Sequence, residues 1–448
     1  MLQLKKIIIS NINPFNLLLT NINVSDSMKK SYKVSLLLFF LLFITAQFSM
    51  AQLGFSGELR VRPEYRRGYK SLALPDQDPA FFISQRTRLK LHYEEERFSF
   101  HIALQDVRTW GNTSQLNISD AYFSLHEAWG GVQISKQFNL KVGRQELVYD
   151  DHRILGSVNW AQQGRSHDLV LLKFEKNSFK WHTGLAYNQD KQQLSTNYYS
   201  VEKNYKTMQF IWLHSEFEKT RGSILFLNNG MQNADTTMSF SQTLGTYLNF
   251  DLGNLKLNLA GYYQMGKDAL KKDLSAGYVN VDVSWPLSFG LIPTIGVEYL
   301  SGTDQSNDLT NNSFAPLYGT NHKFNGHMDY FYVGNHINNV GLTNPYLRLV
   351  YKLDKWILAG TIHYFSSSGE ILDPSDPALT LKNYLGTEVD LSISRKIFEY
   401  LSVSAGYSQM FATNSMEAIK GGDSSTTNNW AWLMLAFTPD FLKSNKKQ

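Results

Sequence analysis

Period-two alternation of apolar and polar side chains constrains this chain more than any other feature of its sequence. In the stretch 55–65, Phe55, Leu59 and Val61 alternate with charged residues such as Arg60 and Arg62. This is the pattern of a β-strand with one apolar face and one hydrated face. The pattern recurs along the chain and predicts an all-β fold. The predicted strands are 55–65, 82–93, 98–107, 118–127, 132–144, 169–175, 179–188, 208–217, 222–229, 244–251, 255–265, 278–285, 293–300, 346–353, 356–365, 387–395, 401–411 and 430–437.

The connections between these strands separate by length. Short ones, such as 94–96, 253–254 and 354–355, alternate with mostly longer ones, of which 301–345 is the longest. Transmembrane barrels show short periplasmic turns and long extracellular loops, and a soluble sandwich has no reason to do so. A closed sheet also pairs its backbone groups within hydrocarbon. We therefore predict a transmembrane antiparallel β-barrel of about 18 strands with a water-filled lumen.

The tryptophans and the lack of long apolar runs agree with a barrel wall. After Gln52 the sequence contains no apolar run of the roughly 18 residues that a spanning helix needs. Interfacial girdles of Trp and Tyr place aromatics at strand ends, whereas β-propensity alone would not favour the ends. Six of the nine tryptophans fall at predicted strand ends: Trp110, Trp129, Trp181, Trp285, Trp356 and Trp430.

The amino-terminal region is interpreted as a processing segment. Residues 28–51 resemble a secretory signal peptide, with lysines before an apolar core at 34–46 and small residues before Gln52. The core is shorter than the roughly 20 residues of a spanning helix. Residues 1–27 are interpreted as an upstream extension from a mis-assigned start. Residues 52–448 are predicted to form a single outer-membrane barrel domain.

Composition limits the partners and the chemistry. Lys and Arg number 43 against 39 Asp and Glu, and they are dispersed, so nucleic acid is not an expected partner. The chain has no cysteine, which removes disulfide and thiolate chemistry. Asp304 and Asp308 do not have the spacing of a calcium loop. We expect no cofactor and no metal. The expected partners in the Gram-negative outer membrane are lipid, lipopolysaccharide and the barrel-assembly machinery, together with an anionic saccharide or small anions.

Several stretches resemble the alginate export family of outer-membrane barrels, in its Bacteroidetes-type members. They are GRQELVYDDHRILG, NWAQQGRSHD, QRTRLKLHYE, DAYFSL, PLYGTNHKFNGHMDYFYVGN and FTPDFLK. The resemblance covers essentially the whole mature chain. It implies an eighteen-stranded channel with an arginine-rich lumen that passes anionic sugar polymers such as alginate. In the exporter type a long periplasmic loop plugs the pore, whereas every periplasmic turn predicted here is short.

The candidate site is a set of basic residues on lumen-facing positions and in one long loop. Rings of Arg or Lys select anions in pores, and the planar guanidinium suits carboxylates. Inward acidic residues such as Glu58, Glu388 and Asp390 leave a second interpretation open, in which the charges only brace the barrel. The candidate lumen residues are Arg60, Arg62, Arg86, Arg88, Lys90, Arg144, Arg153, Arg165 and Arg348.

Two long loops carry further candidates. The segment 150–153 is expected either to constrict the pore, with Arg153 and Arg165 meeting the substrate, or to fold into the lumen and pair its own charges. The stretch 322–332 has His, Lys and Asp beside aromatics, which suits saccharide contact or packing of the loop against itself.

An enzyme is not expected, and no residue is assigned a catalytic role. Ser166, His167 and Asp168 are adjacent, and consecutive strand residues alternate faces, so the three cannot converge. No G-x-S-x-G, H-E-x-x-H or P-loop motif is present. The alternatives to an anion channel are a general-diffusion or uptake porin with structural lumen charges, a barrel enzyme and a surface-binding protein.

Overall fold

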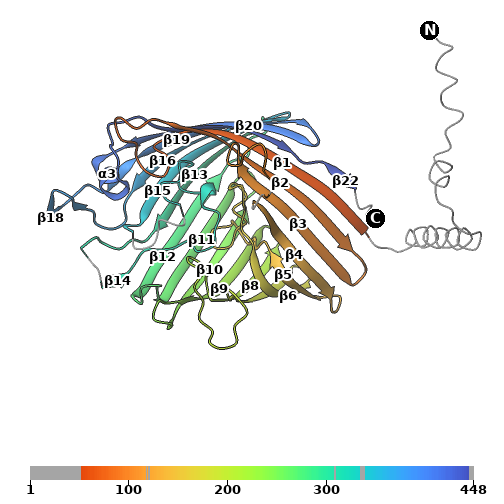
Figure 1. The fold of residues 1–448 in the computed structure, drawn as a ribbon. Helices are drawn as coiled ribbons and strands as arrows, with labels where there is room; N and C mark the ends of the chain where they lie inside the picture. The colour runs from red at the N-terminus through yellow and green to blue at the C-terminus, as the bar shows by residue number, and fades with distance from the viewer. Residues whose placement is uncertain (1–51, 118, 120–121, 307–308, 333–338, 443–448) are drawn as a thin grey trace, which may run out of the picture. The chain divides into compact units, whose positions relative to one another are not determined.

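A computed structural model describes residues 52–117, 119, 122–306, 309–332 and 339–442. The predicted signal peptide and upstream extension lie outside these residues. In the described part, eighteen strands form one closed antiparallel barrel (Figure 1). They are β1 (Gln52–Arg67), β2 (Ala80–Glu94), β3 (Phe98–Thr109), β4 (Phe123–Gln133), β5 (Phe138–Gln145), β6 (His167–Lys176), β7 (Phe179–Tyr187), β8 (Thr207–Phe217), β9 (Thr220–Gln232), β10 (Met238–Asp251), β11 (Lys256–Lys267), β12 (Asp273–Ser284), β13 (Leu291–Leu300), β15 (Leu342–Leu353), β16 (Trp356–Ser366), β19 (Tyr384–Phe398), β20 (Leu401–Ala412) and β21 (Asn428–Phe437).

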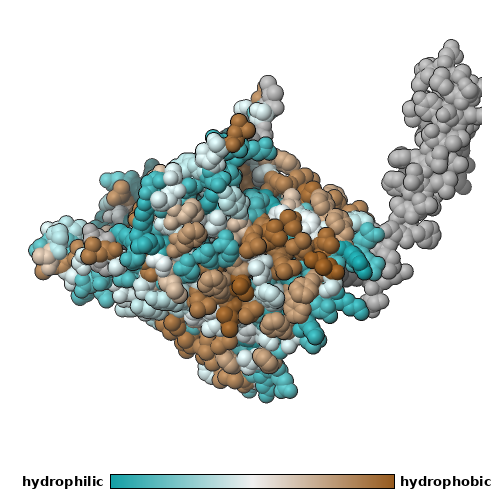
Figure 2. Space-filling view, turned by 90° about the horizontal axis from the view of Figure 1, so that it is seen from below, coloured by the Kyte–Doolittle hydropathy of each residue, from teal (hydrophilic) through white to brown (hydrophobic). Residues whose placement is uncertain are grey.

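The barrel wall follows the alternation expected from the sequence. Leu89, Ile295 and Ile362 point outward and are 44%, 62% and 50% exposed, while their strand neighbours face the lumen. An apolar outer face is what a strand needs against lipid. Figure 2 shows broad hydrophobic areas on the face in view, next to hydrophilic ones. Among the residues that the structure describes, no helix is both long and apolar enough to cross a membrane.

The two ends of the barrel differ in their connections. The turns on the side of the termini are short. The first of them is 95–97 and the last is 399–400, and the longest, 285–290, has six residues. The opposite side carries the long loops, in which lie the smaller elements. These are β14 (Thr310–Asn311), the 3₁₀ turn η2 (Asn321–Lys323), the hairpin of β17 (Leu372–Asp373) and β18 (Asp376–Thr380), and α3 (Asn414–Lys420).

Two of the predicted connections between strands are misplaced. The predicted strands 118–127 and 132–144 placed a turn at Gly130 and Gly131, but both glycines lie inside β4 and pair with β3 and β5. The turn comes later, where Ser135 Oγ accepts the amide of Phe138 at 3.2 Å. The predicted long connection between 229 and 244 was also wrong, because β9 and β10 continue beyond these positions and leave a turn at 233–237.

The predicted tryptophan girdle is only partly present. Trp110, Trp181 and Trp285 are exposed near strand ends, as expected. Trp129 instead stacks on the lumen-facing His101 in the described structure, with ring centroids 5.4 Å apart. Trp430 is fully buried and donates a hydrogen bond to Glu64. Aromatic side chains at strand ends therefore lie inside the barrel as well as at the membrane interface.

The barrel closes between its first and last strands. β21 pairs with β1 between Leu59 and Arg67, and a short β22 (Asp440–Leu442) pairs with β1 at Phe55 and Ser56. Phe441 lies against Phe55, with ring centroids 5.1 Å apart. An added Cβ at Gly57 would stand 2.8 Å from the Phe441 ring, so glycine makes room for it.

We predict that Phe441→Ala weakens this seam. An aromatic pair contributes about 0.5–1.5 kcal/mol beyond its buried area, so the folded barrel band in a heated SDS gel should disappear at a lower temperature. Phe398→Ala removes a comparable pair with Tyr400, whose ring centroids are 5.6 Å apart, away from the seam. A larger effect from Phe398→Ala than from Phe441→Ala would contradict the assignment.

Candidate functional site

A strap of chain crosses the barrel lumen. We use this name for residues 146–166, which connect β5 to β6. At its first end, Asp150 Oδ1 accepts a hydrogen bond from Trp212 Nε1 on β8 at 3.0 Å. Tyr149 Oη lies 3.0 Å from His182 Nδ1 on β7. The strap is thus tied to the β7–β8 wall before it turns inward.

At its other end the strap lies on four arginines. Arg60 and Arg62 project from β1, and Arg86 and Arg88 project from β2, all of them buried. Each guanidinium donates hydrogen bonds to the strap, at 2.7 to 3.5 Å. The acceptors are the main-chain carbonyl oxygens of Asn159, Trp160, Ala161, Gln162 and Gln163.

The four arginines are unusual neighbours for one another. Arg60 pairs directly with Arg86 across the two strands, and like charges opposite each other are unfavourable. Glu58 forms an ion pair with Arg86, and Glu64 forms one with Arg62. Arg60 has no carboxylate within 4.0 Å among the described residues, and its donors go to neutral oxygens. The strap therefore satisfies the hydrogen bonds of this guanidinium without neutralising its charge.

A second part of the wall, separated from β1 by β20 and β21, is acidic and holds a second segment, the long loop 301–341. Two buried carboxylates of β19 accept main-chain N–H groups from its tip. Glu388 Oε1 accepts the amide of Met328 at 2.9 Å, and Asp390 Oδ2 accepts the amide of His327 at 3.2 Å. Arginines thus bind the carbonyls of one segment, while carboxylates bind the amides of the other.

The tip of the long loop fits this wall because of a glycine. Gly326 has φ +83, which favours glycine, and an added Cβ would stand 2.6 Å from the Glu388 carboxylate. The preceding Asn325 donates to Glu298 on β13. The tip therefore approaches the acidic wall as closely as the backbone allows.

The strap and the long loop join inside the lumen, next to Trp430 and Trp432 of β21. Trp160 stacks on His322, with ring centroids 4.4 Å apart and planes 11° apart. Thr320 Oγ1 accepts the amide of Val158 at 3.0 Å. The main-chain hydrogen bonds between the two segments are Gly156 N to Tyr318 O at 2.9 Å, Tyr318 N to Ile154 O at 3.1 Å and Thr320 N to His152 O at 2.8 Å.

One carboxylate of the strap sits in a poorly solvated position. Burial raises the pKa of Asp151 to about 6, although the Lys323 ammonium and the Arg153 main-chain N–H oppose this rise. Lys323 Nζ donates to the Asp151 main-chain oxygen at 2.8 Å, and burial lowers the pKa of this lysine. This hydrogen bond is a further contact between the long loop and the strap.

The two predicted loop arginines hold the segments together. Arg153 is fully buried, with Nη2 2.9 Å from Asn325 Oδ1 and 3.5 Å from Glu298 Oε1. Arg165 Nη1 donates to the main-chain oxygen of Gly319 at 3.0 Å. Both side chains contact the long loop. That loop also packs against itself, as expected, with His322 Nδ1 2.9 Å from Asp329 Oδ1 and the His322 ring stacked on His327.

The remaining predicted residues are more accessible. Lys90 lies 3.6 Å from Glu58, and Arg144 pairs with Asp168 at 2.9 Å. Arg348 lies over the Tyr346 ring at 5.3 Å and has no hydrogen bond or ion pair with any residue that the structure describes. Lys90 therefore shares Glu58 with Arg86 at the edge of the four buried arginines, whereas Arg144 and Arg348 lie on other strands and are not brought together with them.

Sequence reasoning did not find the partners of the arginines. Trp160, Gln162 and Gln163 lie in the stretch NWAQQGR, whose only signal was its polar composition. Gln105 of β3 accepts from Arg88 at 3.0 Å and donates to Gln163 at 3.1 Å. Alternation placed Gln105 on the lumen face but could not say that the strap would reach it.

Two cavities lie beside the strap and the long loop, and Tyr332 lines both. The first, of about 510 Å³, has charged and aromatic walls that include Arg66, Arg108, Glu64, Asp329, Tyr69 and Trp160. The second cavity has a volume of about 640 Å³. Its charged and aromatic lining residues include Arg144, Arg165, Lys203, Lys267, Asp168, Asp268, Tyr205 and Tyr318.

Comparison with solved structures shows the same fold. The chain is similar to OccK11 (OpdR) of Pseudomonas aeruginosa, with 10% identity, a TM-score of 0.58, and coverage of 88% of this chain and 96% of that one. It is similar to a BenF-like porin from Pseudomonas fluorescens Pf-5, with 13% identity, a TM-score of 0.59, and coverage of 87% and 99%. It is also similar to P. aeruginosa OccK8 (OprE), with 9% identity, a TM-score of 0.59, and coverage of 88% and 98%.

Comparison of sequences identifies the family. No curated protein matches the chain significantly. The family model described as alginate export matches residues 51–431, which is most of the chain. The closed eighteen-stranded barrel and the lipid-facing wall agree with that match. The chain therefore belongs to the alginate export family and is a channel of the Gram-negative outer membrane.

Proposed function

We propose that this channel passes anionic solutes, and in particular acidic oligosaccharides of the uronate type. The observation that carries the proposal is the state of Arg60, whose donors are held by neutral carbonyl and amide oxygens with no carboxylate in the described structure close enough to pair. A solute carboxylate offers the same donors a charged acceptor, and charge-assisted hydrogen bonds are the stronger kind. The positive charge of the wall is thus available to attract an anion.

The cavity beside the strap supports a sugar acid over a small inorganic anion. Trp160 and Tyr69 line this cavity of about 510 Å³ together with Arg66 and Arg108, and Arg62 and Arg66 lie over the two rings at 4.2 and 4.1 Å. Guanidinium groups pair with carboxylate, and the aromatic side chains add apolar contact area for a sugar. Because the contacts are repeated and not concentrated at one point, a chain of uronates can move along them without being held.

The short turns favour a second candidate, an uptake or general-diffusion porin. The connections between the described strands on the side of the termini have at most six residues, so none of these turns is long enough to plug the pore as in the exporter type. The segments that fill this lumen come from the opposite end, with the long loops. In this second candidate the arginines only hold the strap, and neutral and acidic sugars pass alike.

The two candidates are separated by conductance of the purified barrel in a planar bilayer. We expect a reversal potential that shows anion preference in a KCl gradient, and block of the current by uronate oligomers but not by neutral oligomers of equal length. Equal block by both, or cation preference, would reject the anion proposal and leave the porin.

Trp160 is expected to contribute to that block. Trp160→Ala should weaken block by uronate oligomers at least roughly fivefold, the equivalent of about 1 kcal/mol. Trp181→Ala is the matched control, because Trp181 is exposed on the outer face. Equal loss of block in both variants would show that Trp160 does not contact the sugar.

A further inference from the structure

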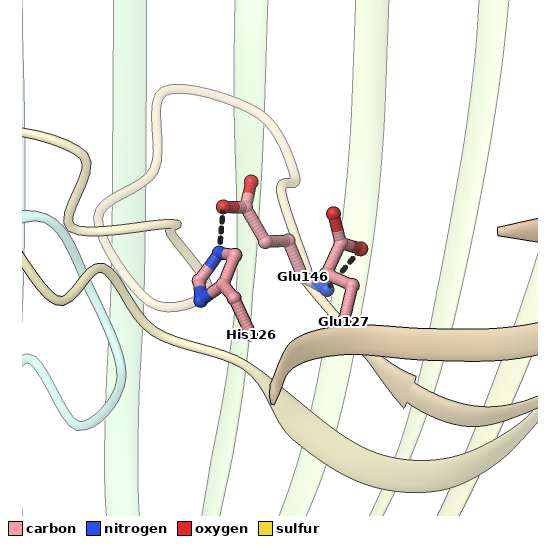
Figure 3. A group of neighbouring side chains, drawn as sticks. All are labelled: His126, Glu127 and Glu146. Carbon is pink, nitrogen blue, oxygen red and sulfur yellow. Dashed lines mark hydrogen bonds and ion pairs between the residues drawn. The ribbon is translucent and has the colours of Figure 1, made fainter. Parts of the chain in front are cut away.

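A β-bulge at the base of the strap brings three metal-ligand residues together. β3 pairs Ala103 with Glu127 and Leu104 with Leu125, so His126 has no partner in the β3–β4 ladder. The extra residue re-aims side chains that regular alternation would send to opposite faces. His126 and Glu127 consequently turn toward the same side, where Glu146 begins the strap (Figure 3).

The ligand atoms of these residues lie close enough to share one ion. One nitrogen of His126 and one carboxylate oxygen each of Glu127 and Glu146 all lie within 4.8 Å of one another. His126 Nε2 is 2.7 Å from Glu146 Oε1, and Glu127 accepts the main-chain amide of Glu146 at 3.1 Å. No other group of three His, Cys, Asp or Glu side chains in the described ranges converges in this way.

Neighbouring side chains fix the group in place. His101 Nε2 stands 3.6 Å from Glu127 Oε2 and stacks on Trp129, which is the position of an outer partner that orients a ligating carboxylate. Arg88 lies 3.8 Å from Glu146, so one cation already stands at the edge of the group. His126 is buried, and its ring stays where the bulge places it.

We propose that His126, Glu127 and Glu146 form a binding site for a divalent transition-metal ion of the Zn²⁺ type. One imidazole nitrogen with two carboxylate oxygens is a donor set that Zn²⁺ accepts at about 2.0–2.2 Å, with a fourth position left for water. Imidazole favours such an ion over Mg²⁺ and Ca²⁺, which prefer all-oxygen sites. The bound ion would join the base of the strap to β4, independently of which solute the channel passes.

The test is direct binding of Zn²⁺ to the detergent-solubilised barrel by titration calorimetry. We expect one saturable site per barrel, with imidazole nitrogen in the metal's coordination shell by X-ray absorption. His126→Ala and Glu146→Gln should each weaken binding at least tenfold. Ca²⁺ at the same concentration should not compete.

The control uses a His–Glu pair that lacks a third ligand. His182 lies 3.1 Å from Glu175 but belongs to no such group in the described residues. His182→Ala should therefore leave Zn²⁺ binding unchanged. The conservative variant His126→Gln, checked for a folded barrel by its migration in SDS gels, separates loss of a ligand from loss of the fold. Absence of saturable binding, or unchanged binding in a folded His126→Gln barrel, would overturn the proposal.

Discussion

Replacing Arg60 and Arg86 together with alanine is expected to raise the conductance of the reconstituted barrel severalfold and to reduce its anion preference. These two side chains make most of the hydrogen bonds that hold the end of the strap against the wall. A hydrogen bond to a charged group contributes about 1.5–3 kcal/mol. Each 1.4 kcal/mol lost raises the population of released strap about tenfold.

The control for this experiment is another lumen arginine that does not touch the strap. Arg348→Ala removes one positive charge from β15, where its guanidinium lies over the Tyr346 ring. It should shift the reversal potential toward cations and leave the conductance close to that of the unaltered channel. An equal rise in conductance in both variants would show that lumen charge alone, and not release of the strap, sets the current.

Arg153→Ala is expected to destabilise the contact between the strap and the long loop by about 3–5 kcal/mol. Arg153 is fully buried, and its removal leaves the buried carboxylate of Glu298 without its ion-pair partner. Trypsin should then cleave the native barrel faster after Arg165 and Lys323, which lie in the two segments. Cleavage of a locally opened segment follows its population, so the rate should rise by at least roughly a hundredfold.

A double variant separates lost packing from stranded charge. Arg153→Ala combined with Glu298→Gln removes the uncompensated carboxylate, so the cleavage rate should fall back part of the way. Arg395→Ala serves as the control, because its guanidinium lies over Trp356 on the wall and touches neither segment. A double variant cleaved as fast as Arg153→Ala would show that the buried charge is not the cause.

The wall of the barrel could be predicted from the sequence because lipid and water act on every second residue. Leu89 and Arg88 are neighbours with opposite surroundings, and alternation alone assigned their faces. Glycine was the main source of error. Gly130 and Gly131 suggest a turn, but hydrogen bonds to β3 and β5 keep them in a strand, and a hydroxyl at Ser135 closes the real turn.

The contents of the lumen could not be predicted in the same way. Alternation places Arg60 and Glu388 inside the barrel, but it does not say where the long connection 146–166 goes. The contacts that bring Trp160 to Arg62 and Met328 to Glu388 involve main-chain carbonyls and amides, which every residue type has. The bulge at His126 is equally hidden, since a regular strand would send His126 and Glu127 to opposite faces.

The most direct test of the occupied lumen is a cross-link between the strap and the wall. Gln162 Nε2 lies 2.9 Å from Ser84 Oγ on β2, and the chain contains no cysteine of its own. In the Ser84→Cys, Gln162→Cys variant, a short bifunctional thiol-reactive reagent, such as a bis-thiosulfonate, should join the two sites in intact outer membranes and hold the conductance at that of the unaltered channel. Gln162→Cys with Thr361→Cys, on β16, should not be joined. Two results would contradict a strap that is held on the arginines. One is that the first pair is not joined by the reagent, and the other is that the joined barrel conducts as much as the Arg60→Ala, Arg86→Ala variant.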